Sequence, residues 1–319
     1  NNRNVVLYIK PGKVRVDSMA LAFKITNGAH ISPGEGEVQD FRAPVVYTVS
    51  AADGKFQKRY VVSMVESSLP SVFDFEYFQF DEDSQYVDFY ETIADVRQEA
   101  WASGNSAFSF IAGEDPKAYP TQVTDEANHL VHGQHALLLE TKSSGFMGGL
   151  LKMPIAAGNL FIGSFDGSNL LHPLTKFGLP YNQVPQKLTG YYNYKPGAQM
   201  TDKNGDPISG IDECDIYAVW YDRAALHIET GKNYLDDSDV FTSPYILGLA
   251  KLNKLEPSVG DAMERFEIPF SYSRNYLADE VLGFGYNLAI VMSSSKNGGT
   301  FVGAVGSRLI VDYLTVENK

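Results

Sequence analysis

The sequence has one cysteine, two tryptophans and no long apolar run, and each shortage excludes a class of protein. With Cys214 alone, the chain cannot form an intrachain disulfide, a four-cysteine zinc site or a C-x-x-C redox pair. No stretch approaches the roughly 18 consecutive apolar residues that a membrane-spanning helix needs. The first residues, NNRNVVLYIK, also lack the apolar segment of a signal peptide. We therefore expect a soluble chain as written, which is compatible with an export signal removed from a longer precursor.

Positive charge is scarce, because 26 Lys and Arg stand against 39 Asp and Glu, which gives a formal net charge of -13. Such a surface repels nucleic-acid phosphates and anionic lipids. We therefore expect no nucleic-acid partner, and membrane contact only through a lipid anchor that this chain does not contain. Cys214 lies in the alternating run DECDIYAVWY, so we predict an ordinary buried strand residue and no nucleophile.

Short β-rich runs separated by Gly, Pro, Asn and Asp clusters recur along the chain, which is typical of antiparallel sandwiches. Ala52-Asp53-Gly54 predicts a hairpin turn between two of these runs. The best helix candidate is residues 86–101, although its apolar positions fit neither the helix nor the strand period. The segment SSLPS, residues 67–71, predicts a boundary between a first domain, residues 1–66, and a second, residues 67–319.

Two parts of the chain resemble known families. Residues 25–65, with a Pro-Gly turn and the run YTVSAADG, resemble the small immunoglobulin-like domains at the N-termini of exported lipoproteins of gut Bacteroidetes. Residues 70–319 resemble the putative carbohydrate metabolism domain. The matching pieces are WASGN (101–105), AGNLFIGSFDG (157–167), LTGYYNYKPG (188–197), DECDIYAVWY (212–221) and SSSKNGGTFVGAVGSRLIVDYLTV (293–316).

This resemblance implies an all-β chain: a small immunoglobulin-like sandwich followed by a larger jelly-roll, galactose-binding-like β-sandwich. It also implies export to the outer-membrane surface or the periplasm, with a lipid anchor in the full-length precursor, and a carbohydrate partner. It implies no catalytic mechanism, so three functions stay open: a glycan-binding protein, a glycoside hydrolase or related enzyme, and an adhesive or structural protein that binds no sugar.

Aromatic and amide side chains are the candidates for sugar contact. Trp101 lies in the polar run WASGN, so an exposed ring beside Asn105 could combine stacking with an amide hydrogen bond; the alternative is a tryptophan that closes the end of the sandwich. In LTGYYNYKPG, strand alternation and Leu188 predict that Tyr192 and Tyr194 are buried. Tyr191, Asn193 and Lys195 would then face outward together and could bind a sugar.

Hydrolysis of a glycoside normally needs two carboxyl groups on either side of the scissile bond. Asp166 and Glu140 end apolar runs and Asp215 opens one, but the spacing selects no pair among 39 acidic residues. The catalytic residues of an enzyme therefore stay unknown.

Structural calcium is the only cofactor that we expect. The run DKNGDPISGIDE, residues 202–213, has the acidic spacing of a calcium loop but carries Pro207 where that loop needs glycine, so a plain hairpin is favoured. His129, His132 and His135 are three residues apart, and we favour loop histidines over a zinc site. The resemblance to jelly-roll sandwiches instead directs attention to residues 73–76 and 310–313. We predict that these segments pair, that Asp74 or Glu76 approaches Asp312, and that calcium or a basic partner such as Arg308 lies between them.

Overall fold

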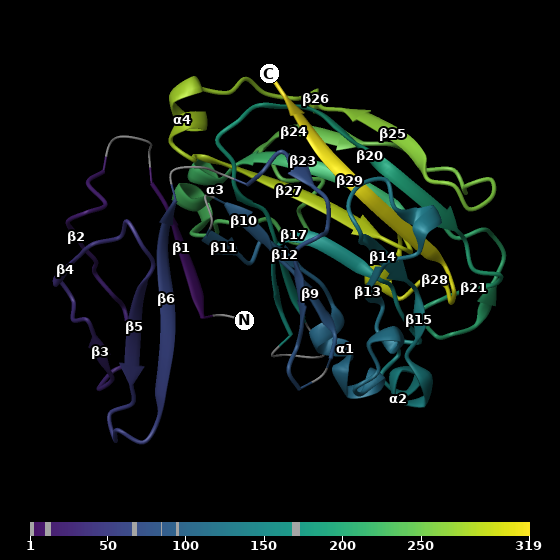
Figure 1. Cartoon of the computed structure of the whole chain (residues 1–319). Coiled ribbons are helices and arrows are strands. Elements are labelled where there is room, and N and C mark those ends of the chain that lie inside the picture. The colour runs from purple at the N-terminus through teal and green to yellow at the C-terminus, as the bar shows by residue number, and fades with distance from the viewer. Residues whose placement is uncertain (1–2, 10–13, 66–68, 84, 94–95, 168–172) are drawn as a thin grey trace.

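The computed structural model describes residues 3–9, 14–65, 69–83, 85–93, 96–167 and 173–319, and the chain is built mainly of strands (Figure 1). The all-β prediction is confirmed. Strands up to residue 65 form sheets of their own, which we call the N-terminal unit, and the larger unit follows from β7 (Val72–Phe73) onward. The predicted boundary at residues 66 and 67 lies outside the described residues.

The N-terminal unit has a four-stranded sheet and a short two-stranded ladder. The sheet order is β1 (Asn4–Tyr8), β6 (Gln57–Val65), β5 (Val45–Ser50), β3 (His30–Ser32), and β2 (Met19–Ala20) pairs with β4 (Val38–Gln39). The hairpin predicted at residues 52–54 is confirmed, since β5 and β6 pair out to Ser50 and Gln57, and Gly54 has a φ of 70°. A small core forms around Phe41, Tyr47 and Val62. The immunoglobulin-like class of this unit stays a prediction.

The larger unit is a sandwich of two sheets. The eight-stranded sheet runs β12 (Trp101–Ala102), β17 (Asn159–Asp166), β27 (Tyr286–Ser293), β23 (Asp215–Asp222), β24 (Ile246–Lys251), β26 (Ser271–Tyr272), with β18 (Leu174–Phe177) on β17 and β19 (Leu179–Pro180) on β27. The six-stranded sheet runs β13 (Thr121–Thr124), β14 (Ala136–Glu140), β29 (Arg308–Asn318), β20 (Pro185–Lys195), β25 (Glu264–Pro269), with β7 on β29. In Figure 1, β20 and β29 run side by side, with β25 beyond β20.

The main core lies between the two sheets, and strand alternation fills it. In β23, Ile216, Ala218 and Trp220 point into this core, together with Leu309 and Val311 of the opposite sheet. These side chains are almost fully buried, so the two sheets exclude water from the space between them.

The eight-stranded sheet also has an apolar outer face. Tyr217, Val219 and Tyr221 of β23 form a second cluster with Leu226 and Leu235. Leu226 comes from α3 (Arg223–Thr230) and Leu235 from the chain that follows it. The run DIYAVWYD is therefore apolar at every position from 216 to 221 because both faces of β23 are covered.

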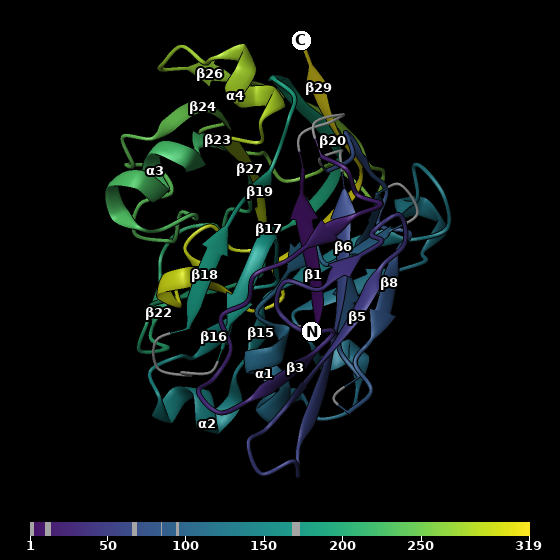
Figure 2. The same cartoon turned by 90° about the vertical axis from the view of Figure 1, so that its left-hand side faces the viewer.

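Contacts between described residues connect the units. The ring of Tyr8 packs on the ring of Phe284 with 5.4 Å between centroids, and Asn4 Nδ2 donates to Glu99 Oε1 at 3.3 Å. Figure 2 shows β1 and β6 of the N-terminal unit in front of the larger unit, with α3 and α4 (Ala278–Leu282) at its upper end.

The remaining elements are short. They are β8 (Phe78–Phe80), β9 (Val87–Phe89), β10 (Glu91–Ile93), β11 (Val96–Gln98), α1 (Asn105–Ala112), β15 (Lys142–Ser143), α2 (Gly145–Leu150), β16 (Ile155–Ala156), β21 (Met200–Thr201), β22 (Pro207–Ile208), β28 (Gly303–Ala304) and 3-10 turns at 116–118, 127–129 and 298–300. The helix considered at residues 86–101 is wrong, because β9, β10, β11 and the start of β12 occupy its described part. No helix of the described residues has the length and apolar character to cross a membrane.

Tyr192 and Tyr194 are buried as predicted, with 5% and 0% of their surfaces exposed. Both belong to the main core, together with Leu188. Cys214 is buried as predicted, although it lies directly before β23 and not within it, and burial raises the pKa of its thiol. That it is no nucleophile stays a prediction.

We expect Tyr194→Ala to lower the free energy of unfolding by about 3 to 5 kcal/mol, because the truncation leaves a cavity in the main core. Tyr191→Ala, on the half-buried neighbour, should cost about 1 kcal/mol or less. Urea unfolding followed by fluorescence measures both. Equal losses for the two variants would contradict the assigned faces of β20.

Candidate functional site

Trp101 and Asn105 lie in the interior, so the predicted sugar contact at these residues is wrong. Trp101 is 6% exposed, donates from Nε1 to Glu91 Oε1 at 2.7 Å, and packs edge-on against Phe73. Asn105 is fully buried and exchanges hydrogen bonds with the backbone of Thr121 at 2.8 and 3.1 Å. The polar run WASGN gave no sign of this burial, because the covering residues come from distant parts of the chain.

In the second predicted sugar-binding set, Tyr191, Asn193 and Lys195, only part of the side chains is accessible to a ligand. Tyr191 is half-buried on the outer face of the six-stranded sheet. Asn193 lies on the outer face as predicted, but it is not exposed: 3% of its surface is accessible, and its Nδ2 donates to the carbonyls of Gly260 and Ala262. Lys195 Nζ donates to Ser258 O at 3.1 Å. The last two side chains hold the 258–262 loop against the sheet, so they do not form a row that a sugar could use.

The strands predicted to meet near Asp312 do pair, but the register differs from the prediction, since Val72 and Phe73 of β7 pair with Thr315 and Leu314 of β29 and not with residues 310–313. The partners of Asp312 are different from those predicted. Asp312 accepts hydrogen bonds from the backbone N–H groups of Val131 and His132 at 2.6 and 2.9 Å. Burial raises the pKa of Asp312, and these hydrogen bonds oppose that rise without cancelling it.

Histidines, and not Arg308, are the basic groups at this place. Glu76 accepts from His135 Nδ1 at 3.0 Å and from the N–H of Gln134 at 2.6 Å. Burial works to raise the pKa of Glu76, but these hydrogen bonds outweigh it and leave the pKa below its usual value. Arg308 instead pairs with Glu126 at 3.2 Å.

The 131–135 loop therefore takes up the carboxylate oxygens that calcium would need. His132 Nδ1 also lies 3.7 Å from Asp74 Oδ2. Among the described residues there is no group of three or more His, Cys, Asp or Glu that could hold a metal ion. Asp74, Glu76 and Asp312 thus do not form a calcium ligand set in this arrangement, and calcium binding by the chain stays a prediction.

The other candidate acids and the 202–213 loop have structural partners. Glu140 pairs with Lys142 at 2.7 Å, Asp166 lies 4.0 Å from Lys176, and Asp215 pairs with Lys251. The loop is a hairpin as favoured, since Met200 pairs with Ile208 and Asp202 accepts the N–H groups of the turn.

A cavity of about 230 Å³ lies on the outer face of the eight-stranded sheet, where β17, β18 and β19 meet the start of α3. Its floor includes Gly163, where a Cβ would stand 2.0 Å from the carbonyl oxygen of Lys176, so only glycine permits this approach. The lining residues are Gly163, Ser164, Lys176, Gly178, Leu179, Pro180, Arg223, Asn233, Tyr234 and Asn287. None of these ten described residues is an aspartate, glutamate or histidine.

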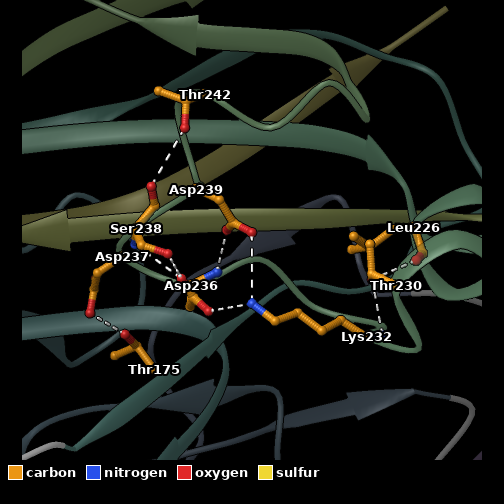
Figure 3. A network of polar contacts seen from close by, with 9 residues as sticks. All are labelled: Thr175, Leu226, Thr230, Lys232, Asp236, Asp237, Ser238, Asp239 and Thr242. Carbon is orange, nitrogen blue, oxygen red and sulfur yellow. Dashed lines mark hydrogen bonds and ion pairs between the residues drawn. The ribbon is translucent and has the colours of Figure 1, made fainter.

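The wall that carries Asn233 and Tyr234 is a loop, residues 231–242, stabilised by its own polar contacts (Figure 3). Lys232 Nζ donates to Asp236 Oδ2 at 2.9 Å, and the N–H of Asp236 donates to Asp239 Oδ1 at 2.8 Å. Asp237 accepts from the Thr175 hydroxyl of β18. The Phe177 N–H donates to Leu235 O at 2.7 Å, which fastens the loop to the sheet and positions the Tyr234 ring.

Two polar side chains of the cavity have atoms without partners. Asn287 is 2% exposed and donates to the Tyr221 hydroxyl at 2.8 Å, while its Oδ1 accepts no hydrogen bond. Arg223 donates from Nη2 to Phe284 O at 2.8 Å, while its buried Nε has no acceptor. Buried groups of this kind cost free energy unless they find a partner, so these two atoms are candidates for hydrogen bonds to a polar ligand.

A second depression, of about 500 Å³, lies beside β24 and β26 and is bordered by Phe241, Pro244, Tyr272 and Arg274. Its polar groups are already used within the chain. Arg274 Nη1 donates to Pro244 O at 2.8 Å, and the Tyr272 hydroxyl donates to Pro185 O. The first cavity is therefore the better candidate for a site.

Signals in the sequence for the residues of this cavity are weak. Asn233 and Tyr234 follow Gly231 in the polar run GKNYLDDSD, and Arg223 begins a short helix. Lys176 and Asn287 stand in strands that look ordinary in the sequence. Only the folded chain brings these five residues together.

Residues 74–317 match the profile of the putative carbohydrate metabolism domain. The chain belongs to this family. Residues 1–64 match a second profile, the N-terminal domain of SGBP. No curated protein matches the chain.

Two solved structures are similar to this member of the putative carbohydrate metabolism domain family. One, from Bacteroides thetaiotaomicron VPI-5482, is 36% identical, with a TM-score of 0.86, over 100% of this chain and 91% of that chain. Another, from Bacteroides vulgatus ATCC 8482, is 32% identical, with a TM-score of 0.68, over 79% of this chain and 100% of that chain. Both are named putative glycoside hydrolases.

The buried Glu91 should make stability depend on pH. Burial raises its pKa to about 7 from an ordinary value of 4.5, although the hydrogen bond from Trp101 opposes this rise. The folded chain then holds a proton that the unfolded chain releases, so stability falls as pH rises between these values. Glu91→Gln keeps the acceptor for Trp101 and removes this titration. From about pH 4.5 to pH 7, the wild type should lose up to about 3 kcal/mol relative to the variant.

Urea unfolding of both proteins at pH 5 and pH 7.5 measures this difference, and groups that titrate in both proteins cancel in the comparison. Parallel losses in the wild type and in Glu91→Gln would show that Glu91 has an ordinary pKa.

Proposed function

We propose that this chain is a non-catalytic glycan-binding protein and that the cavity at β17, β18, β19 and α3 is its sugar site. The observation that carries the proposal is the composition of the cavity wall: an aromatic ring, two amides and two cationic groups, with no carboxylate among the described lining residues. The chain belongs to a carbohydrate-related family, which supports a sugar as the ligand.

The chemistry of each wall residue suits a sugar. The half-buried Tyr234 ring offers an apolar face for the C–H groups of a pyranose. Asn233 and Asn287 offer amide groups, and the free Oδ1 of Asn287 is an acceptor for a sugar hydroxyl. The loop and the sheet hold these groups in place before binding, which reduces the entropy lost when the ligand is ordered.

Glycoside hydrolysis is the second candidate, because the two similar solved proteins are named for it. That reaction normally uses a pair of carboxyl groups about 5 to 10 Å apart across the sugar. The cavity wall lacks them, and Glu91, whose pKa is raised to about 7, is 6% exposed and lines neither depression. Binding without hydrolysis therefore agrees better with the geometry.

The N-terminal match supports a place at the cell surface. SGBP denotes a surface glycan-binding protein, and residues 1–64 match its N-terminal domain. We propose that the chain is exported and held at the outer membrane by a lipid anchor on its precursor. The N-terminal unit, as an immunoglobulin-like spacer, would hold the sandwich away from that surface.

Tyr234→Ala should weaken glycan binding about tenfold or more, since it removes the stacking surface. Its stability should stay within about 0.5 kcal/mol of the wild type, because the ring is not part of either core cluster. Tyr191→Ala, a half-buried tyrosine on the opposite sheet, is the matched control and should bind as the wild type does. Binding on a glycan array, followed by titration calorimetry with the polysaccharides that bind, measures both effects.

A loss of binding in Tyr191→Ala with none in Tyr234→Ala would move the site to the six-stranded sheet. Release of reducing ends from a bound polysaccharide by the wild type would favour the hydrolase instead.

A further inference from the structure

We infer that the cavity takes an anionic sugar, one that carries a carboxylate or a sulfate, and that Arg223 and Lys176 bind this group. The inference rests on the proposed function, because it names the class of glycan for the same site. Its basis is a cationic wall residue that has no anionic partner within a strongly acidic chain.

Arg223 is the central observation. It forms no ion pair with any described carboxylate, although the whole chain carries 39 acidic residues. Its guanidinium is half-buried, Nη2 donates to Phe284 O, and the buried Nε has no acceptor. A half-buried charge with an unused donor is costly alone, and a planar anion accepting from the guanidinium would remove that cost.

The position of Arg223 on its helix strengthens this argument. Arg223 is the first residue of α3, where the helix dipole disfavours a positive charge. Asp222 does not pair with it, since the Asp222 side chain accepts the N–H of Ala225 as the N-cap at 2.8 Å. The fold therefore places the positive charge of Arg223 where the helix dipole opposes it. A bound anion would stabilise that charge.

Two lysines lie near the same ring. Lys176 Nζ stands 5.5 Å from the centre of the Tyr234 ring and Lys232 Nζ stands 5.8 Å from it. Lys232 is neutralised by Asp236 at 2.9 Å, with Asp239 at 4.0 Å. Among the described residues, the one ion pair of Lys176 is a long one, 4.0 Å, with Asp166, so its ammonium can still donate hydrogen bonds to a ligand.

The other nearby carboxylates are taken up by the scaffold. Asp236 and Asp239 brace the 231–242 loop, and Asp237 accepts from the Thr175 hydroxyl outside the cavity wall. With these acids engaged, the described lining residues other than Arg223 and Lys176 are all neutral. An anion would be bound at the cations, while Tyr234 and the amides contact the neutral part of the sugar.

The net charge of -13 makes this local arrangement necessary for an anionic ligand. The rest of the surface repels a polyanion, so an acidic glycan can be held only where positive charge is concentrated. Binding should therefore weaken at high salt, because the contact is electrostatic and partly exposed to solvent.

The test measures binding of the full chain to matched pairs of polymers by titration calorimetry and affinity electrophoresis. One pair is polygalacturonate and its methyl ester, and the other is a sulfated galactan and its desulfated form. The anionic member of at least one pair should bind about tenfold more tightly than its neutral counterpart. The pair that shows this preference tells whether carboxylate or sulfate is the group recognised.

Lys176→Gln should lower affinity for the anionic polymer about tenfold and leave the neutral polymer unchanged. Lys187→Gln is the matched control, because it removes the same charge from the six-stranded sheet, where Lys187 pairs with Glu267 at 2.9 Å. Arg223→Gln should act as Lys176→Gln does. If loss of its bond to Phe284 O unfolds that variant, as a thermal melt would reveal, Lys176→Gln decides alone.

Equal binding of the neutral and anionic polymers, with no effect of Lys176→Gln, would overturn the inference and leave the proposed glycan site in place. Absence of binding to any polymer would overturn the inference as well. The same holds if Lys187→Gln lowers the affinity for the anionic polymer as much as Lys176→Gln does. Of these outcomes, only the absence of binding to every polymer would also contradict the proposed function.

Discussion

The cover over the outer face of the eight-stranded sheet is the constraint on which the rest of the structure depends. β23 carries Trp220 toward the main core and Tyr217, Val219 and Tyr221 toward the other side. Exposing these side chains to water would lose hydrophobic free energy, and α3 and the 231–242 loop pack over them. The cover ends at β17, β18 and β19, and the cavity lies at that margin.

The same cover explains the distribution of charge around the cavity. A loop of many acidic residues is held together when its carboxylates accept hydrogen bonds from its own backbone and from Lys232. These carboxylates therefore stabilise the loop, and the described residues of the cavity wall include cationic and amide groups but no carboxylate. An aromatic ring flanked by ammonium groups can then meet a ligand without a competing carboxylate in the wall.

The six-stranded sheet has a different outer face. The 131–135 loop covers Asp312, and the 258–262 loop is held down by Asn193 and Lys195. These loops satisfy polar groups of the sheet, and the neighbouring Tyr191 of β20 stays half-buried. The two outer faces of the sandwich thus differ: loops cover the outer face of the six-stranded sheet, and the outer face of the eight-stranded sheet carries the cavity.

The sequence by itself determined the strands, the hairpins at residues 52–54 and 202–206, the burial of Tyr192 and Tyr194, and the pairing of β7 with β29. These features follow from alternation, turn residues and family resemblance, which act over a few neighbouring residues. Only the tertiary structure decided the burial of Trp101, Asn105 and Asn193, because the groups that cover them lie 10 to 69 positions away. It also decided the cavity, since Lys176, Arg223, Tyr234 and Asn287 come from separate elements whose neighbours are set by sheet order.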